Sequence, residues 1–235
     1  MRAFYLKNLT PQESYALKGD EAHHLINVVR LQLAEPLLLL NGQGLLVWTT
    51  VDFISRKELV LKYSRHEQRD QKAPLDLALG IPKKDALELS LKEAVELGFG
   101  TIFLVRGDFS QIKIPESDRI EAILISALEQ SNSPFLPHII SIDWEEIPFQ
   151  NYSEIYWMNS KPGPEKILSE KNSKKLLIVG PEGGFSPKEV EFFQKIENLC
   201  SIHLPTPILR TPTAIAAGAG FLLGRLLNQD NYDKL

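Results

Sequence analysis

The sequence predicts an α/β protein with a mostly parallel sheet in its C-terminal part, preceded by a small β-rich domain. From residue 75 onward, short apolar segments alternate with amphipathic helical segments. Such alternation is typical of a parallel sheet covered by helices on both faces. Residues 1–72 instead contain several short apolar segments separated by turn residues, and residues 70–74 read as a linker. We therefore expect two domains, 1–72 and 73–235.

The N-terminal part is expected to be a small β-barrel with one helix. Its predicted strands are 2–6, 37–41, 45–51 and 59–63, and residues 41–44 (Asn-Gly-Gln-Gly) form a turn between two of them. The helix covers roughly 21–31, with Asp20 as its candidate N-cap.

The C-terminal part is expected to alternate strand and helix throughout. Asp85 is the candidate cap of a helix that has Glu88 at its third position and ends at Gly98. Further helices are expected at 118–130 and 213–227, and strands at 75–81, 101–105, 138–142, 155–159, 176–179 and 201–204.

The most informative segment is a glycine-rich loop between a strand and a helix. The apolar strand 176–179 ends in Gly-Pro-Glu-Gly-Gly at 180–184, and a helix begins at once, with Ser186 and Glu189 in the positions of a capping box. Ligands bind where the strands of an open α/β sheet end, and glycines let a ligand approach the backbone. Glu182 disfavours phosphate and there is no P-loop signature, so a neutral or cationic ligand is favoured. The alternative is a tight turn without a ligand.

Two more loops are expected to belong to the same site as the glycine-rich loop. One is Glu129-Gln130-Ser131 at a predicted helix end, and the other runs from 204 to 214 into the last helix. That helix begins with many small residues (214–220), which let a loop or a second subunit come close.

Composition narrows the class of protein. Of the 235 residues, 43% are hydrophobic and 24% are charged, as in a globular protein, and the single cysteine, Cys200, excludes a disulfide framework and a cysteine-based zinc site. We find no signal pattern, and the apolar stretch 214–223 is too short to span a bilayer. A cytoplasmic protein is expected.

The net charge of −4 is unevenly distributed. Residues 1–72 have ten Lys and Arg against eight Asp and Glu, whereas the remainder has sixteen against twenty-two. The basic residues gather between Arg56 and Lys72, where they form either a track for a phosphate backbone or merely the polar edges of a strand and a linker.

The chain resembles the RsmE family of SPOUT-class methyltransferases, which modify N3 of a uridine in small-subunit (16S) ribosomal RNA. The segments that carry the resemblance are spread from end to end: 23–31, 40–44, 83–88, 93–98, 129–131, 178–185 and 208–211.

The resemblance implies a specific architecture and cofactor. Residues 1–72 would form a PUA-like RNA-binding β-barrel, and residues 73–235 a SPOUT domain whose C-terminal segment is tied in a trefoil knot and pairs two subunits into a homodimer. The knot would hold S-adenosylmethionine, and no metal is implied. The implied cofactor-binding residues are Met158, Asn159, Gly180, Pro181, Glu182, Gly183, Leu204, Ile208, Leu209 and Thr211.

Other residues are candidates for chemistry and RNA contact. Arg210 and Glu129 could stabilise the developing anion or guide the proton from uridine N3, with phosphate binding and a local cap as their respective alternatives. Candidate RNA-binding residues are His24, Arg30, Lys83 and Lys84, and the two lysines could equally be a solvated helix start.

The chain departs from the family pattern at three positions. Arginine is usual in place of Phe109 and within a few residues after Ser131, where this chain has Asn132, and glutamate is usual in place of Pro212. Two hypotheses follow: an active methyltransferase, or a divergent member that binds RNA or the ribosome without methyl transfer.

Overall fold

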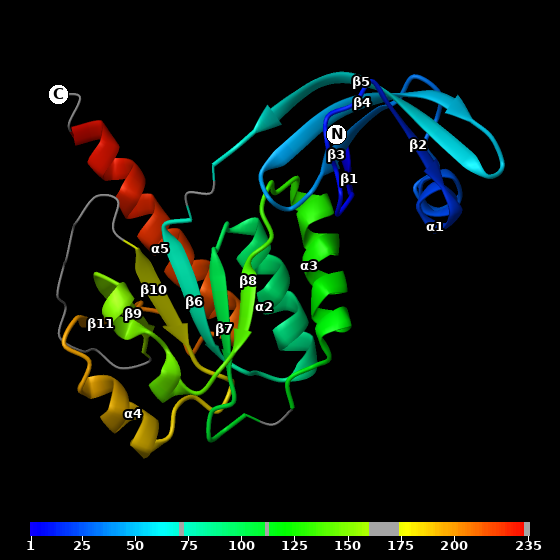
Figure 1. Cartoon of the computed structure of the whole chain (residues 1–235). Coiled ribbons are helices and arrows are strands. Elements are labelled where there is room, and N and C mark those ends of the chain that lie inside the picture. The colour runs from blue at the N-terminus through cyan, green and yellow to red at the C-terminus, as the bar shows by residue number, and fades with distance from the viewer. Residues whose placement is uncertain (71–72, 111–112, 160–173, 233–235) are drawn as a thin grey trace. The chain divides into compact units, whose positions relative to one another are not determined.

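A computed structural model describes residues 1–70, 73–110, 113–159 and 174–232 (Figure 1). By their internal contacts the residues form two compact units, the first comprising 1–71 and 125–136 and the second 72–124 and 137–235. Residues 125–136 lie far along the chain but pack with the N-terminal strands. Helix α3 (Ser117–Ser131) therefore supplies residues to both units.

The first unit is built on a five-stranded sheet. Its strand order is β1-β3-β4-β5-β2, with β1 parallel to β3 and the other pairs antiparallel. The strands are β1 (Arg2–Tyr5), β2 (Ser14–Lys18), β3 (Pro36–Leu40), β4 (Leu45–Ile54) and β5 (Glu58–Gln68). The four predicted strands are present. Strand β2, in which only Tyr15 and Leu17 are buried, was not predicted.

The turn between β3 and β4 has the predicted position. The Asn41 side chain accepts hydrogen bonds from the amides of Gln43 and Leu45, and Gly42 and Gly44 both have positive φ. Asparagine and glycine stabilise this backbone path because one supplies a local acceptor and the other tolerates left-handed conformations.

The helix of the first unit differs from the prediction. A short α1 (Gly19–His23) leads into a single π-helical turn, η1 (His24–Val28), so the expected helix to residue 31 was too long. The N-cap is Lys18 and no side chain caps it, so the assignment of Asp20 as cap was wrong. Asp20 lies within the first turn, where its charge still favours the helix dipole.

The second unit contains the predicted parallel sheet. Its six strands have the order β11-β9-β10-β6-β7-β8, and every pair is parallel. They are β6 (Leu75–Gly80), β7 (Thr101–Val105), β8 (His138–Ser141), β9 (Glu154–Met158), β10 (Lys175–Val179) and β11 (Leu199–Ile202). The central strands are buried, as their near-continuous apolar sequences require.

Helices cover both faces of this sheet. The helices of the unit are α2 (Lys84–Glu96), α3, α4 (Pro187–Gln194) and α5 (Thr211–Tyr232), with 3₁₀ turns at η2 (Trp144–Glu146) and η3 (Phe149–Asn151). Phe193 of α4 packs in one core cluster with Ile178. The neighbouring Leu177 points to the opposite face, where it lies beside Gly218 of α5. Figure 1 shows α5 running alongside α2 on that face.

Three helix caps that the sequence predicts can be compared with the observed helix ends. Ser186 and Glu189 do form the capping box of α4, and Gly98 follows the end of α2 with φ +75°. Asp85 does not cap α2, because the N-cap is Lys83 and no side chain of that cap is bonded. Glu88 instead pairs with Arg119 of α3. Among the described residues, no helix has the length and apolar character needed to cross a membrane.

Candidate functional site

A cavity of about 880 Å³ lies at the carboxyl ends of β9, β10 and β11. Residues of β9, β10, β11 and α4 form part of its wall, together with the start of α5. Most of the rest of the wall comes from the loops that follow these three strands. All ten residues predicted to bind the cofactor line it: Met158, Asn159, Gly180, Pro181, Glu182, Gly183, Leu204, Ile208, Leu209 and Thr211. The parallel sheet explains the convergence, since its strands end at one edge.

The glycine loop after β10 is tightly packed at two of its glycines. A side-chain carbon at Gly180 would lie 2.9 Å from the ring of Phe185, and one at Gly183 would lie 3.0 Å from Cβ of Phe109. Gly184 has φ +70° and donates its amide to the carbonyl of Pro181 over 2.9 Å. Close approach thus disfavours a side chain strongly at Gly180 and less strongly at Gly183, and the backbone conformation favours glycine at position 184.

Aromatic rings pack against Phe185, the residue that follows this loop. Phe185 meets Trp144 and Trp157 edge to face at 5.7 Å between ring centres, and Phe193 at 5.0 Å. Phe185 is confined by these rings on one side and lines the cavity on the other, so a larger residue at Gly180 would push it toward the cavity. Packing of Phe185 therefore couples the glycine loop to the shape of the cavity.

The loop before α5 is attached directly to the glycine loop. The buried hydroxyl of Thr211 donates to the carbonyl of Gly180 over 2.9 Å. On the opposite side of the wall, the amide of Asn159 donates to Ile202 over 2.9 Å. Ile208 lines the cavity and is nevertheless 89% exposed, so an apolar side chain stands beside the cavity with little protein cover.

Glu182 has a structural partner at this site. Its carboxylate accepts the backbone amide of Lys83, at 3.1 and 3.3 Å for the two oxygens, and so satisfies the N-terminus of α2. Its negative charge lies at the cavity wall beside this helix. The side chains of Lys83 and Lys84 are exposed.

Two polar atoms in the cavity wall were not anticipated from the sequence. The indole nitrogen of Trp157 and the hydroxyl of Ser201 are buried and have no hydrogen-bond partner within the described part of the chain. Buried donors of this kind normally have a partner. Trp157 lies on β9 and Ser201 on β11, close to the loops that follow these strands. Their place near the carboxyl ends of parallel strands is the feature of the sequence that could have identified them as site residues.

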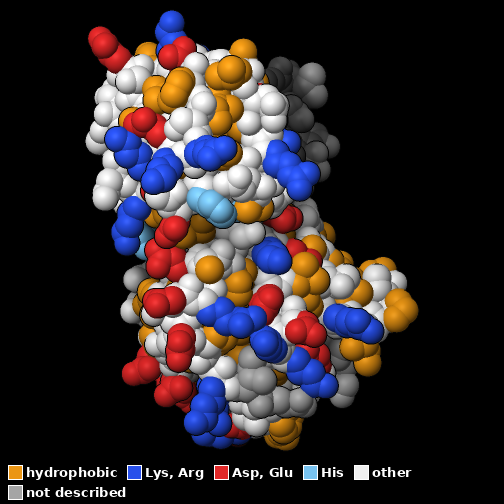
Figure 2. Space-filling model, turned by 90° about the vertical axis from the view of Figure 1, so that its right-hand side faces the viewer, with side chains coloured by type: hydrophobic (Ala, Val, Ile, Leu, Met, Phe, Trp, Pro, Cys, Tyr) orange, Lys and Arg blue, Asp and Glu red, His pale blue; other side chains and the backbone are white. Residues whose placement is uncertain are grey.

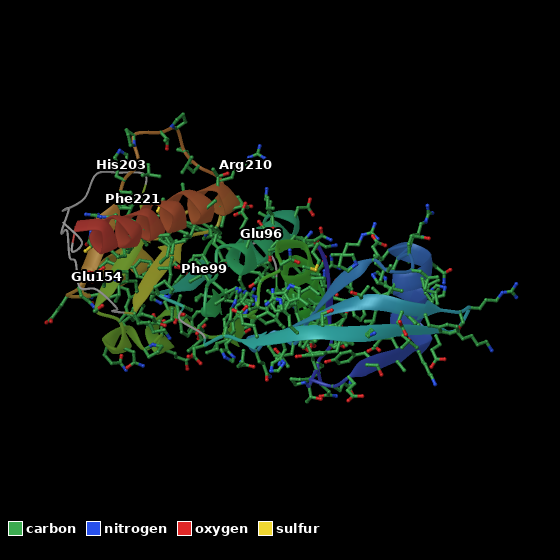
Figure 3. All side chains as sticks on the ribbon, turned by 90° about the horizontal axis from the view of Figure 1, so that it is seen from above. Glu96, Phe99, Glu154, His203, Arg210 and Phe221 are labelled. Atoms are coloured by element: carbon green, nitrogen blue, oxygen red, sulfur yellow. The ribbon has the colours of Figure 1, made fainter. Side chains whose placement is uncertain are left out.

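Arg210 is exposed and does not line the cavity wall. It precedes α5, at whose N-terminal end Figure 3 shows it, and its carbonyl accepts the amide of Ala214 over 2.8 Å. Its neighbours Leu209 and Thr211 are both in the wall. The guanidinium is thus held next to the cavity by a helix start, with its charge in solvent.

Glu129 lies in the first unit and is not part of the cavity wall. Its carboxylate accepts the amide of Tyr5 over 2.9 Å. Burial raises the pKa of Glu129, although the Tyr5 amide and the nearby His24 act in the opposite direction. The sequence analysis grouped Glu129 with the site loops, whereas in the structure its carboxylate binds the amide of Tyr5, 124 residues away in the sequence and within the same unit.

The two predicted RNA-binding residues of the first unit, His24 and Arg30, are exposed. His24 stacks on Phe4 with ring centres 6.3 Å apart, at the start of the π-helical turn. Arg30 follows that turn with φ +58°, a conformation that arginine rarely adopts.

The three departures from the family pattern have different surroundings. Phe109 is 45% exposed and lies against Gly183. Asn132 has φ +55° and follows α3. Pro212 is buried at the second position of α5, where a missing amide costs no helical hydrogen bond. In the described ranges, no group of three or more His, Cys, Asp or Glu could hold a metal ion.

Comparison with known proteins identifies the family to which the chain belongs. Residues 69–222 match the model of the RNA methyltransferase domain. The chain is 28% identical to ribosomal RNA small subunit methyltransferase E of Rickettsia conorii, covering 91% of each chain. It is 29% identical to ribosomal RNA small subunit methyltransferase E 2 of Borreliella burgdorferi, over 82% of this chain and 84% of that one.

Solved structures agree on the fold. Ribosomal RNA small subunit methyltransferase E from Neisseria gonorrhoeae, bound to S-adenosylmethionine, aligns with a TM-score of 0.81 at 24% identity and covers 95% of this chain and 97% of that one. A putative methyltransferase from Legionella pneumophila in complex with the same cofactor aligns with a TM-score of 0.79 at 21% identity over 95% and 97% of the two chains. The resemblance seen in the sequence is confirmed: the chain belongs to the RNA methyltransferase domain family, and nearly its whole length is similar to proteins named ribosomal RNA small subunit methyltransferase E.

Proposed function

We propose that this protein transfers the methyl group of S-adenosylmethionine to N3 of a uridine in small-subunit (16S) ribosomal RNA. The observation that carries the proposal is the cavity itself. Its wall contains all ten residues that the family resemblance implies for the cofactor, and they come from loops far apart in the sequence. The relatives named as small-subunit ribosomal RNA methyltransferases supply the substrate class.

The residues of the cavity fit S-adenosylmethionine. A volume of about 880 Å³ is within the range usual for cofactor sites. Leu204, Ile208 and Leu209 offer apolar contact to an adenine, and the glycine loop offers backbone groups to the polar parts of the cofactor. The buried donors of Trp157 and Ser201 are suited to its heteroatoms. Glu182 favours a cation over a phosphate at the same wall.

The cofactor supplies an activated methyl group on a sulfonium. Uridine N3 carries a proton and is a poor nucleophile until that proton is lost or its charge is dispersed, so the protein must hold the base and stabilise the anion. Arg210 is placed for this role because its neighbours line the cavity while its own charge points to solvent. Alignment by the loops contributes further. Glu129 remains a candidate for guiding the proton on the strength of the family resemblance alone.

The finer architecture is part of the proposal. Residues 73–235 would form a SPOUT domain in which the segment ending in α5 makes a trefoil knot, and the Thr211–Gly180 hydrogen bond between two of its loops is consistent with that path. A homodimer would pair through α5, where Gly220 is exposed and a side-chain carbon there would meet nothing within 4 Å.

Residues 1–72, nearly all of which belong to the first unit, would form a PUA-like domain that binds RNA. Figure 2 shows several Lys and Arg side chains together on one face of this unit. On its sheet, the guanidinium of Arg65 stacks 3.4 Å from the ring centre of Trp48, which makes a flat surface of the kind that bases stack on. His24 and Arg30 are exposed on the same unit, and Lys83 and Lys84 would contact RNA from the second.

The alternative function is binding of RNA or the ribosome without methyl transfer. It is favoured by Phe109 and Asn132, where arginines that would contact phosphate or base are missing, and by Pro212, where a glutamate is missing. The cavity wall favours the first function, because it keeps every residue expected for the cofactor.

The test is methyl transfer from labelled S-adenosylmethionine to small ribosomal subunits that lack the modification. The labelled nucleoside is identified by mass spectrometry, and subunits already modified serve as the control. Label in N3-methyluridine is the expected result. Cofactor binding without any label in the RNA would support the binding-only alternative.

A further inference from the structure

Phe109 is an exposed aromatic side chain beside the methyl-donor cavity. It lies in the loop after β7 and keeps 45% of its surface accessible. Its Cβ lies against Gly183, where a side-chain carbon on the glycine would come within 3.0 Å of it. Gly183 belongs to the cavity wall and Phe109 does not, so the ring stands next to the cavity without filling it.

The loop that carries Phe109 is held firmly from α4. The amide of Asp108 donates to the buried Glu189 carboxylate over 3.1 Å, and the Ser186 hydroxyl donates to the Asp108 carboxylate over 2.5 Å. The same Glu189 oxygen accepts the indole N–H of Trp144 over 2.9 Å. Gly107 lies so close to this oxygen that a side-chain carbon at position 107 would be only 2.7 Å from it. The backbone at Gly107 and Asp108, directly before Phe109, is therefore fixed by these contacts before any ligand arrives.

An exposed ring that follows a fixed stretch of backbone is suited to stacking against another flat surface. The loss of conformational entropy on binding is small because the backbone directly before Phe109 is already held in place. Phenylalanine offers neither charge nor hydrogen bonds, so phosphate is a poor partner for it, whereas every nucleobase has a face that can stack. RNA is recognised mostly through unpaired bases stacked on aromatic side chains.

We infer that Phe109 is a substrate-positioning residue that stacks a nucleobase of the RNA beside the cavity. This inference rests on the proposed function, because it takes RNA as the substrate. It also gives a physical meaning to one departure from the family pattern: where a charged contact to RNA is missing, a stacking contact replaces it.

The experiment compares variants of Phe109 in the full-length protein. Stacking of one base contributes about 1–3 kcal/mol, so Phe109→Ala is expected to raise the KM for RNA and the Kd for a small-subunit RNA fragment by roughly 5- to 150-fold. The Kd for S-adenosylmethionine and the midpoint of thermal unfolding stay the same. Phe109→Tyr and Phe109→Trp restore RNA binding, whereas Phe109→Leu, which is apolar but cannot stack, does not. Ile140→Ala, at a residue of 41% exposure on β8, is the control and leaves RNA binding unchanged.

Three results would overturn the inference. If Phe109→Leu bound RNA as well as the wild type, apolar cover rather than stacking would be the role of the ring. If Phe109→Ala weakened cofactor binding, the ring would only support the glycine loop. If it changed the oligomeric state, a second copy of the chain would be the partner. Wild-type protein that binds RNA without transferring a methyl group would refute the proposed function, and the RNA-binding comparison would still decide the role of Phe109.

Discussion

Thr211 and Gly180 join two loops that are 31 residues apart in the sequence. The hydroxyl of Thr211 donates to the carbonyl of Gly180 over 2.9 Å, and both residues line the cavity. One hydrogen bond thus connects the glycine loop to the start of the last helix, and the two sides of the wall depend on each other.

Replacing Thr211 by valine should weaken cofactor binding. The substitution keeps the shape of the side chain and removes its hydroxyl, so about 1 kcal/mol is lost and the Kd for S-adenosylmethionine rises roughly fivefold. Isothermal titration calorimetry measures this, with Thr211→Ser as the control that retains the donor. Equal affinity in Thr211→Val would show that packing alone holds the loops together.

Replacing Gly180 by alanine should destabilise the second unit and impair cofactor binding. The added carbon would lie 2.9 Å from the Phe185 ring, which is confined by Trp157 and Phe193. Such overpacking costs about 1–3 kcal/mol of unfolding free energy. Gly224→Ala is the control within α5, because its added carbon meets nothing within 4 Å and should stabilise the helix by about 0.5–1 kcal/mol. Chemical denaturation of both variants gives the comparison, and a loss of the same size in both would contradict the role of the Phe185 contact.

Replacing Arg210 by alanine should abolish methyl transfer and leave cofactor binding near normal. The guanidinium is exposed and outside the cavity wall, so its loss removes charge from the substrate side only. Loss of one such stabilising group typically costs about 10²–10³ in kcat. Single-turnover transfer and cofactor titration are the two measurements, and Arg210→Lys should recover part of the rate. Unchanged turnover in the alanine variant would exclude Arg210 from the mechanism.

Replacing Glu129 by glutamine should stabilise the first unit at neutral pH. Burial raises the pKa of this carboxyl in the folded protein, so the folded state holds the proton more tightly than the unfolded state. Its contribution to stability is fully present below the unfolded pKa and is lost as the pH rises through the folded pKa. Glutamine has no charge to desolvate and can still accept the Tyr5 amide. The midpoint of thermal unfolding should therefore rise at pH 7 and change little at pH 4, whereas Glu121→Gln, at an exposed position of α3, should show no such difference. A stabilisation independent of pH would refute the assignment.

Replacing Gly220 by tryptophan should convert a homodimer into a monomer. The position is exposed and has free space around it within one chain, so the monomer tolerates the large side chain. A second α5 packed closely against it does not. Sedimentation measures the mass, which for the single chain is 26.5 kDa. Glu121→Trp is the matched control on α3, and wild-type protein sedimenting as a monomer would refute the proposed pairing.

The parallel sheet and the cavity could be predicted because both follow from local patterns. The strand before Gly180 and the capping box at Ser186 can each be recognised from residues that are neighbours in the sequence. A parallel sheet brings the ends of its strands together, however far apart the strands are in the sequence. The glycine loop and the loop before the last helix were therefore identifiable without any knowledge of their contacts. Residues 129–131, which were grouped with them, are not in the wall, and Met158 and Asn159 were named only through the family resemblance.

The features that were mispredicted depend on residues far apart. Asp85 was expected to cap α2, but the helix begins earlier and its free amide at Lys83 is satisfied by Glu182, 99 residues away. The donors of Trp157 and Ser201 became apparent only once burial was known, because a local sequence pattern does not show which polar atoms lack a partner. The packing of residues 125–136 with the N-terminal strands is likewise a tertiary property.

The order of the strands has a consequence for synthesis of the protein. The cavity needs β9, β10 and β11 and also Ala214 near the start of the last helix, so a chain that stops before residue 214 cannot complete the wall. During synthesis, a nascent chain that already contains the strands of both sheets still lacks part of the cofactor cavity until this residue has emerged. The methyl donor therefore cannot guide the folding of shorter chains, and it stabilises only a chain that extends past this residue.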